Sequence, residues 1–209
     1  KSWNVSDSIE QPESSKLAIE WFNNILAKTA TEMNDLMGKY RISEALMAVY
    51  KLFWDEFASW YLEIIKPAYG QPIDSKTYNS TLEFFEKLLL LIHPFMPFIT
   101  EELWQNVKER KAGESIMSES IVELSTAKYD EQIIADFEAC KELVSSIRTV
   151  RNQKNIGPRE PLTIEVIGSN PIAALNPIIS KIACLEDILV QDAKSEGTVS
   201  IMVGTTEFA

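Results

Sequence analysis

The sequence predicts a mainly α-helical protein, a bundle of about five helices followed by a small C-terminal α/β subdomain. Three observations predict this fold class. Apolar residues recur at steps of three and four along most of the chain, which is the period of amphipathic helices. Two prolines, Pro94 and Pro97, interrupt an apolar helical pattern. After Gly157 and Pro158 the apolar period changes to two, the period of half-buried strands.

The size and composition are those of a globular chain. With 209 residues, 45% of them hydrophobic, the chain can bury a core. Cys140 and Cys184 have no Cys-x-x-Cys or histidine spacing, so a zinc site or disulfide framework is not supported and a reducing, cytoplasmic location is expected. No apolar run reaches the ~20 residues of a membrane span, so no membrane contact is expected. We expect a linker over 1–15, a helical domain over 16–160 and the subdomain over 161–209.

The first two helices are predicted from apolar stripes. One runs from Lys16 to Gly38, and a second starts with Ser43 as its cap and ends before Pro67. The inward positions of the first are Ala18, Phe22, Ile25, Thr29, Met33 and Leu36. Those of the second form two adjacent stripes, Leu46, Val49, Phe53, Phe57, Trp60 and Ile64, and Trp54, Ala58, Tyr61 and Ile65. A helix so apolar lies between neighbours, so we interpret its aromatics as core rather than as ligand contacts.

A third and a fourth helix flank the two prolines. The third starts near Lys76, and the fourth runs from Thr100, as its cap, to about Arg110. The inward positions are Tyr78, Leu82, Phe85, Leu89 and Ile92 on the third, and Leu103, Trp104 and Val107 on the fourth.

The connection between these two helices is itself apolar, with Phe95, Met96, Phe98 and Ile99 around the prolines. An apolar connection suggests a corner packed inside the protein. On that interpretation Phe98→Ala would cost about 3–5 kcal/mol as a core cavity, and a change at His93 would be far milder.

The rest of the chain divides into a crossover, a fifth helix and the subdomain. Residues 111–128 read as an irregular crossover whose patches Ile116-Met117 and Ile121-Val122 tuck against the bundle. From Asp130 a regular stripe predicts the fifth helix, with Ile133, Phe137, Cys140, Val144, Ile147 and Val150 inward. The subdomain is predicted to contain strands at 162–166, 188–190 and 199–203, and a helix over 171–184 that breaks at Asn176-Pro177 and has Cys184 on its inner face.

One segment of this acidic chain is basic. The formal net charge of −11 disfavours nucleic-acid binding for the chain as a whole, because phosphate contacts need Lys and Arg. From Arg148 to Arg159, however, there are four cations and no carboxylate. Arg148, Arg151 and Asn155 are three and four apart, on one side of a helix. They are either a phosphate-binding site or a solvated helix end where the dipole favours cations.

No convergent catalytic set stands out. The chain has one histidine, His93, in an apolar corner, and we find no Gly-rich phosphate loop, paired-carboxylate motif or nucleophile elbow. We therefore do not expect an active site within the chain, and a self-sufficient enzyme is the least favoured reading.

Several segments closely resemble the anticodon-binding domain of valyl-tRNA synthetases. They are Ile92 to Gln105 (IHPFMPFITEELWQ), Tyr40 to Ala45 (YRISEA), Phe53 to Phe57 (FWDEF), Trp60 to Glu63 (WYLE), Lys66-Pro67, Glu114 to Met117 (ESIM), and Arg148 with Arg151-Asn152. The resemblance covers nearly the whole chain from the first helix. Isoleucyl- and leucyl-tRNA synthetases share the bundle, so they remain alternatives, and so does a helical protein-interaction or structural domain without RNA binding.

The resemblance implies an RNA partner and a separate catalytic domain. The partner would be the anticodon arm of tRNA(Val), and the catalytic domain of the same polypeptide would use ATP and Mg. The H-I-G-H and K-M-S-K-S signatures of that chemistry are absent here, so no cofactor is expected in this chain. The chain ends at Ala209 without a polar tail, so we expect it to be a piece of a longer protein.

Residue chemistry and the resemblance together give the candidate tRNA contacts. Loop bases are read by stacking on aromatics and by polar groups, and the loop backbone is held by cations. The candidates are the corner of Lys39, Tyr40 and Arg41, the basic helix end of Arg148, Arg151, Asn152 and Lys154, and Asp55 and Lys66 on the outer edge of the second helix.

Overall fold

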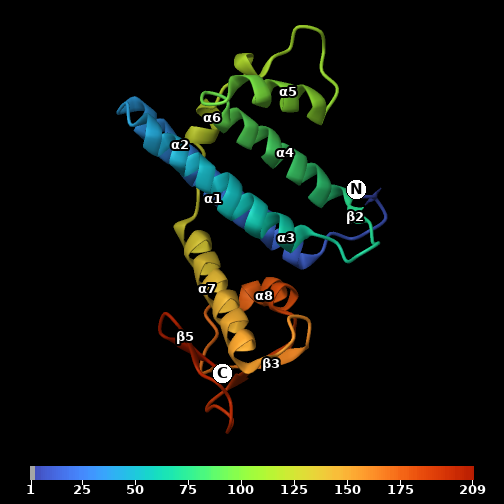
Figure 1. Ribbon diagram of the computed structural model, residues 1–209, viewed down its shortest axis with the longest axis vertical. Coiled ribbons are helices and arrows are strands. Elements are labelled where there is room, and N and C mark those ends of the chain that lie inside the picture. Colours follow the sequence, from blue (N-terminus) through green and yellow to red (C-terminus); the bar gives the residue numbers. More distant parts are fainter. Residues whose placement is uncertain (1–2) are drawn as a thin grey trace. The chain divides into compact units, whose positions relative to one another are not determined.

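The computed structural model describes residues 3–209, which form two compact units, 3–130 and Glu131–Ala209 (Figure 1). The first two residues of the predicted linker lie outside the described residues. The mainly helical fold class with a small sheet is confirmed. The units divide at Asp130, whereas the sequence placed the boundary at 160. The last long helix belongs to the second unit because it packs on the strands and the short helix there.

The first unit contains six α-helices among its described residues. They are α1 (Glu13–Gly38), α2 (Ile42–Lys51), α3 (Leu62–Ile65), α4 (Ser75–Ile92), α5 (Pro97–Val107) and α6 (Val122–Ser125). A π-helix, Leu52–Tyr61, joins α2 to α3 without a break, and Ile116–Ser118 is a 3-10 turn. The predicted linker includes a short strand, β1 (Val5–Ser6), which pairs in parallel with β2 (Ile73–Asp74).

Aromatic rings form the centre of the first unit. The ring of Phe22 on α1 lies 5.4 Å from Phe57, 5.0 Å from Tyr61 and 4.8 Å from Phe84, measured between centroids. The Tyr61 hydroxyl is hydrogen-bonded to Thr81 Oγ1 at 3.0 Å, and burial raises the pKa of Tyr61. Aromatic pairs in tilted and edge-on arrangements stabilise a core beyond the contribution of the buried area. The core predicted for the first helix is therefore confirmed except at Ile25, which is half-buried, and half of the positions predicted for the second helix are buried, namely Val49, Phe57, Tyr61, Ile64 and Ile65.

The π-helix changes which side chains of the second predicted helix face inward. The helix ends before Pro67 as predicted, but Arg41, not Ser43, precedes its first residue. Hydrogen bonds from i to i+5 turn the chain less per residue than α-helical bonds, so one straight α stripe cannot continue through the segment. Trp54, in the π-helix, was predicted to face inward but is exposed, and so is Leu46 in α2, where Ala45 and Val49 take the buried side; this part of the prediction is wrong.

The buried stripe of α4 is displaced by one position from the predicted one. The core positions are Thr77, Thr81, Phe84, Leu88, Leu89 and Leu91. Two of them are threonines, which the predicted stripe did not include. Thr81 Oγ1 donates to the Thr77 carbonyl at 2.7 Å and bonds the Tyr61 hydroxyl, so burial leaves it satisfied. The helix begins under the Asp74 cap, whose Oδ1 accepts from Thr77 N at 2.8 Å.

The break between α4 and α5 is confirmed, but the corner is not buried. Pro97 occupies the first turn of α5, where a missing N–H costs little, so Thr100 lies inside the helix and is not its cap. Thr100 and Trp104, four apart, take the inward face, so Phe98 points the other way and is 90% exposed. The interpretation of Phe98 as core is therefore wrong. The Thr100 hydroxyl and His93 Nδ1, 2.7 Å apart, join the two helices.

The crossover after α5 packs on the first unit at Ile116 and again at α6, which lies against α1. Ile116 is buried against Leu89 and Trp104, whereas Met117 and Val122 are exposed. Glu101 Oε2 accepts from Ser115 Oγ at 2.7 Å and from Ile116 N at 3.1 Å. The hydrogen bond from Gln105 to Glu101 Oε1, followed by these two, lowers the pKa of Glu101. The prediction that both apolar patches tuck inward holds for Ile116 only.

The second unit packs two helices on a four-stranded sheet. Its elements are α7 (Glu131–Lys154), β3 (Leu162–Ile167), a 3-10 turn (Ala173–Leu175), α8 (Asn176–Ala183), β4 (Leu185–Gln191), β5 (Ile201–Val203) and β6 (Thr206–Phe208). The strand order is β4-β3-β6-β5, with β3 and β4 parallel and α8 in the crossover between them. Ile164 and Val166 on β3 are buried, as their alternation predicted.

Details of the second unit differ from the prediction in two places. Strand β6 was missed, although Gly204, with a φ of 56°, marks the tight turn that precedes it. Cys184 follows α8 in the left-handed region, with a φ of 53°, and so does not lie on the inner face of the helix. Cys140 is buried in the α7 stripe as predicted, and burial raises its pKa to about 12.

Two features are absent from residues 3–209. Among these residues no helix combines the length and apolar character that crossing a membrane requires. Within the same range no three His, Cys, Asp or Glu side chains group in a way that could hold a metal ion.

Candidate nucleic-acid interface

The corner at Lys39, Tyr40 and Arg41 turns the chain from α1 into α2. Tyr40 adopts a left-handed φ of 56°, and the Arg41 amide donates to the Leu36 carbonyl at 2.9 Å, which closes the end of α1. This turn leaves the Tyr40 ring 89% exposed at the tip of the helix pair. The ring is therefore presented to solvent in the way that stacking on an unpaired base requires.

The two cations of this corner already have carboxylate partners. Lys39 Nζ lies 2.7 Å from Asp35 Oδ2, and the Arg41 guanidinium pairs with both oxygens of Glu44. The Glu44 bond raises the pKa of Arg41. Exposed pairs of this kind contribute little to stability, so they can open for a phosphate at small cost. While these ion pairs are formed, the corner is nearly neutral. Its distinguishing feature is then the exposed Tyr40 ring.

A groove beside this corner is acidic on balance. It holds about 480 Å³ between α1 and α2. Its charged lining residues are Glu32, Arg41, Glu44, Lys51 and Glu56. Three carboxylates against two cations disfavour a phosphate, so the groove itself is a poor place for an RNA backbone.

Asp55 lies in the π-helix and Lys66 directly after α3, and both are exposed. Lys66 Nζ pairs with Glu63 Oε1 at 3.0 Å. Asp55 brings a negative charge to the π-helix and would repel a phosphate, so it could only accept from a base edge.

The basic end of α7 is the second candidate surface. Arg148, Asn152 and Lys154 are exposed on its last turns. No carboxylate occurs from Leu143 to Arg159. We keep the name "basic end of α7" for these three residues. Together with the exposed Arg159 in the following loop, which was not among the candidates, they give this unit a locally positive surface.

Arg151 differs from its neighbours because it is 4% exposed. Its Nη1 donates to the carbonyls of Gly157 at 2.9 Å and Glu160 at 2.8 Å. Its Nη2 donates to the carbonyls of Ala183 at 2.8 Å and Cys184 at 3.1 Å, at the C-terminal end of α8. The guanidinium therefore ties α7, the following loop and α8 together. The prediction that Arg151 shares an accessible face with Arg148 is wrong.

The reason for its burial lies in where α8 ends. The last carbonyls of a helix lack intrahelical partners and carry partial negative charge. A planar guanidinium with several N–H donors can satisfy carbonyls from two directions at once. No signal within residues 148–155 distinguishes this arginine from an exposed one, because its acceptors lie up to 33 positions away in sequence.

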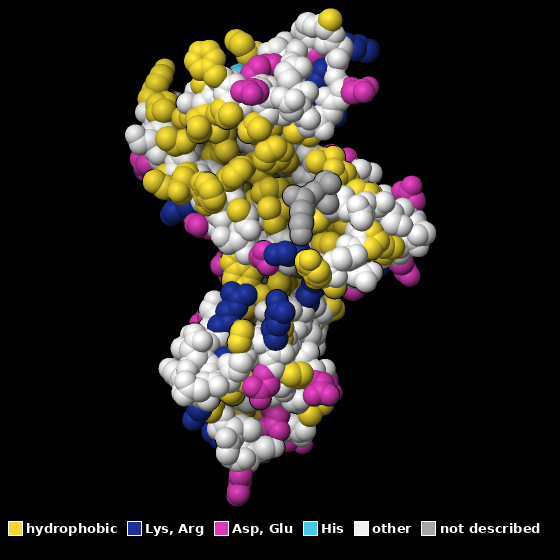
Figure 2. All heavy atoms as spheres, turned by 45° about the vertical axis from the view of Figure 1, so that its right-hand side comes forward, with side chains coloured by type: hydrophobic (Ala, Val, Ile, Leu, Met, Phe, Trp, Pro, Cys, Tyr) yellow, Lys and Arg dark blue, Asp and Glu magenta, His cyan; other side chains and the backbone are white. Residues whose placement is uncertain are grey.

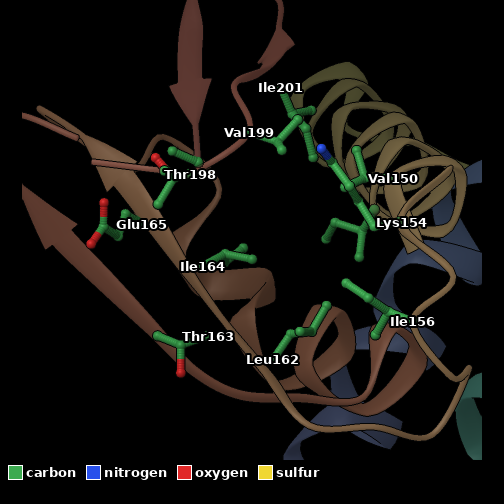
Figure 3. A pocket seen from close by; sticks show the side chains of 13 residues that line it. Val150, Lys154, Ile156, Leu162, Thr163, Ile164, Glu165, Thr198, Val199 and Ile201 are labelled. Carbon is green, nitrogen blue, oxygen red and sulfur yellow. The ribbon is translucent and has the colours of Figure 1, made fainter. Parts of the chain in front are cut away.

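An apolar cavity of about 530 Å³ lies beside the basic end of α7, between α7, β3 and the segment before β5 (Figure 3). The apolar lining includes Val150, Ile156, Leu162, Ile164, Val199 and Ile201. Lys154 reaches across from α7 along this lining (Figure 3). The other charged group, Glu165, accepts from Ser195 N at 2.9 Å and Ser195 Oγ at 2.6 Å, and these bonds lower its pKa.

Known proteins match this chain along most or all of its length. The family described as "Anticodon-binding domain of tRNA ligase" matches residues 20–166. Over all 209 residues the chain is 58% identical to the valine–tRNA ligase of Phocaeicola vulgatus and 46% identical to that of Porphyromonas gingivalis. It is 54% identical to the valine–tRNA ligase of Bacteroides thetaiotaomicron. In each case the match takes in the whole of this chain and 24% of the length of the relative.

Proposed function

The chain belongs to the anticodon-binding domain family of tRNA ligases, and from this we propose that it receives the anticodon arm of tRNA(Val) for a valine–tRNA ligase. The observation that carries the choice of valine is the identity of 58%, across the whole chain, to a protein named valine–tRNA ligase. A helical domain alone would fit isoleucyl- and leucyl-tRNA synthetases equally well.

The rest of the ligase reaction is assigned to residues outside this chain. The chain spans about a quarter, 24%, of the relatives it matches. It lacks the H-I-G-H and K-M-S-K-S signatures that the resemblance associates with ATP chemistry. We therefore place the use of ATP and Mg in the catalytic domain of the same polypeptide, which we take to be cytoplasmic. In this proposal the present chain holds and orients the tRNA.

Specificity can be tested directly with the purified chain. Binding to tRNA(Val), tRNA(Ile) and tRNA(Leu) transcripts is compared at one low and one moderate salt concentration. We expect salt-dependent binding with a preference for tRNA(Val), because phosphate contacts supply affinity and loop bases supply discrimination. Binding to none of the three at either salt would support the second candidate, a protein-interaction domain, which the net charge of −11 favours.

Tyr40 is proposed to stack on an anticodon-loop base, since its ring is 89% exposed on a fixed turn. Tyr40→Ala should weaken binding of tRNA(Val) by about 1–3 kcal/mol, the range for one base–aromatic stack, and Tyr40→Phe should retain most of it. Fluorescence anisotropy with labelled tRNA measures both. Tyr69→Ala is the matched control, because Tyr69 is also exposed but lies in the loop before β2. Equal affinities for the Ala and Phe variants would argue against stacking.

The basic end of α7 is proposed to contact phosphates through Arg148 and Lys154, and Arg151 is omitted because it is buried. Arg148→Ala with Lys154→Ala should reduce the slope of log affinity against log salt by about 0.7–0.9 for each lost contact. Discrimination among tRNAs should survive, because phosphates carry no base identity.

The control for this salt series is Lys16→Ala, which removes an exposed cation from α1 that pairs with Glu13. Thermal unfolding of each variant is followed in parallel. If the fold is intact and the slope is the same as in the unmodified chain, Arg148 and Lys154 act only as favourable charges at a helix end.

A further inference from the structure

Arg41 and Glu44 form a side-on ion pair beside the exposed Tyr40 ring. Nε of Arg41 donates to Oε1 of Glu44 at 2.6 Å, and Nη2 of Arg41 donates to the second carboxylate oxygen, Oε2. The two residues lie three apart at the start of α2, so their side chains share one side of the helix. Two parallel hydrogen bonds of this kind fix the plane of a guanidinium.

The backbone of Arg41 is fixed as well. Its amide donates to the Leu36 carbonyl at 2.9 Å, and its carbonyl accepts from Ala45 N at 3.0 Å. Arg41 therefore closes α1 and opens α2 at the same time. Because hydrogen bonds hold both its backbone and its side chain, a ligand of this guanidinium would order it little further, and the entropy loss on binding would be small.

One edge of the Arg41 guanidinium has no partner within the described residues. A guanidinium has five N–H groups, and Glu44 accepts from two of them, so three remain on Nη1 and Nη2. The side chain is 52% exposed, which leaves these donors accessible to a ligand. The edge between Nη1 and Nη2 carries two parallel N–H groups, which pair with two adjacent acceptor atoms.

The charge of Glu44 decides which acceptors suit this edge. A phosphate bound there would lie close to the Glu44 carboxylate, and the two negative charges would repel each other. Asp35, which pairs with Lys39, brings a second carboxylate to the same corner. The edge of a base offers acceptor atoms without a net charge and avoids this repulsion. The free edge of Arg41 is therefore better suited to an RNA base than to a phosphate.

The surroundings of the corner favour the same choice. The groove between α1 and α2 carries three carboxylates, those of Glu32, Glu44 and Glu56, against two cations. On the face that Figure 2 shows, the side chains over the first unit, in the upper part of the view, are mainly hydrophobic and the cations there are scattered. An RNA backbone is held by several neighbouring cations, so scattered cations favour contacts with bases instead.

We propose that Glu44 is a positioning residue that directs the free edge of Arg41 toward an anticodon-loop base with two adjacent acceptors. Guanine offers such a pair in N7 and O6, and cytosine offers one in N3 and O2. This inference rests on the proposed function and adds to it a residue pair that selects the base. Stacking on Tyr40 tolerates any base, so the discrimination would come from Arg41.

Transcripts of tRNA(Val) with single base changes in the anticodon loop test the proposal. Each guanine is changed to adenine and each cytosine to uracil, which keeps the size of the base but places a donor beside an acceptor. With the unmodified chain, at least one change should weaken binding about 5- to 100-fold, the range for one bidentate contact between arginine and a base. With Arg41→Ala the same change should alter the affinity less than about twofold, as measured by fluorescence anisotropy.

Glu44→Gln tests the positioning role, because glutamine keeps the length of the side chain but has one acceptor oxygen and no charge. Binding of tRNA(Val) should weaken about 2- to 10-fold, since a flexible Arg41 must then be ordered by the RNA. The effect of the sensitive base change should become smaller in this variant. In both variants the slope of log affinity against log salt should change by less than about 0.3, because no phosphate contact is lost.

Glu13→Gln is the matched control. Glu13 also lies in the first turn of a helix, α1, and pairs with an exposed cation three positions away, Lys16. Its replacement should leave the affinity for tRNA(Val) and the response to base changes as they are in the unmodified chain. Thermal unfolding of each variant, followed in parallel, reports whether the fold is intact.

Three outcomes would overturn the proposal while the unmodified chain still binds tRNA. A fall in the salt slope of about 0.7–0.9 in Arg41→Ala would make Arg41 a phosphate contact. Tighter binding by Glu44→Gln would show that Glu44 competes with RNA for the guanidinium. Unchanged discrimination among the transcripts in both variants would mean that the pair does not read a base. Binding of no transcript by the unmodified chain would instead contradict the proposed function, and this inference with it.

Discussion

Arg151→Met is expected to lower the free energy of unfolding of the second unit by about 3–5 kcal/mol, because hydrogen bonds to a charged group contribute about 1.5–3 kcal/mol each and several are lost together. The guanidinium donates to four backbone carbonyls, those of Gly157, Glu160, Ala183 and Cys184. Methionine fills similar space but leaves these buried acceptors without a donor, and each carries a desolvation cost. The loss should appear as weaker amide protection across β3, β4 and α8, measured by hydrogen exchange.

Two further variants separate charge from geometry at this site. Arg151→Lys keeps the charge but cannot reach carbonyls in two directions, so an intermediate loss is expected. Arg148→Ala, three positions away and exposed, should change stability by less than about 0.5 kcal/mol. Equal, small effects at the two arginines would show that the hydrogen bonds of Arg151 do not stabilise the fold.

Phe22→Ala should cost about 3–5 kcal/mol in the first unit, because it opens a cavity at the centre of the aromatic core. The Phe22 ring has 0% exposure and contacts Phe57, Tyr61 and Phe84. Phe98→Ala is the matched control, since the same atoms are removed from a side chain that is 90% exposed. That change should cost less than about 0.5 kcal/mol. Urea unfolding followed by circular dichroism compares the two.

A large loss at Phe98 would restore the interpretation of the segment between α4 and α5 as a buried corner. A small loss at Phe22 would instead mean that the surrounding side chains collapse into the space, which a close-packed core allows only in part. The two variants therefore test in one experiment whether the Phe22 side chain on α1 is buried and whether the Phe98 side chain on α5 is exposed.

The sequence alone determined the order of the helices, the helix break near Pro94 and Pro97, and the change to strands after Pro158. These features depend on local chemistry: proline lacks an amide donor, Gly38 ends a helix readily, and apolar period distinguishes helix from strand. It also determined the family, because the quoted segments extend over most of the chain. The turn that contains Tyr40 was predicted for the same reason, because local signals mark it.

Only the tertiary structure decided which apolar and charged side chains face inward. An apolar residue on a helix is buried only where another element covers it, and Phe98, Leu46 and Trp54 are not covered within the described residues. A cation is buried only where acceptors from elsewhere converge on it. Arg151 meets carbonyls up to 33 positions away and is buried, whereas Arg148, on the same helix, is exposed. Such convergence depends on packing between elements, which the helical period does not encode.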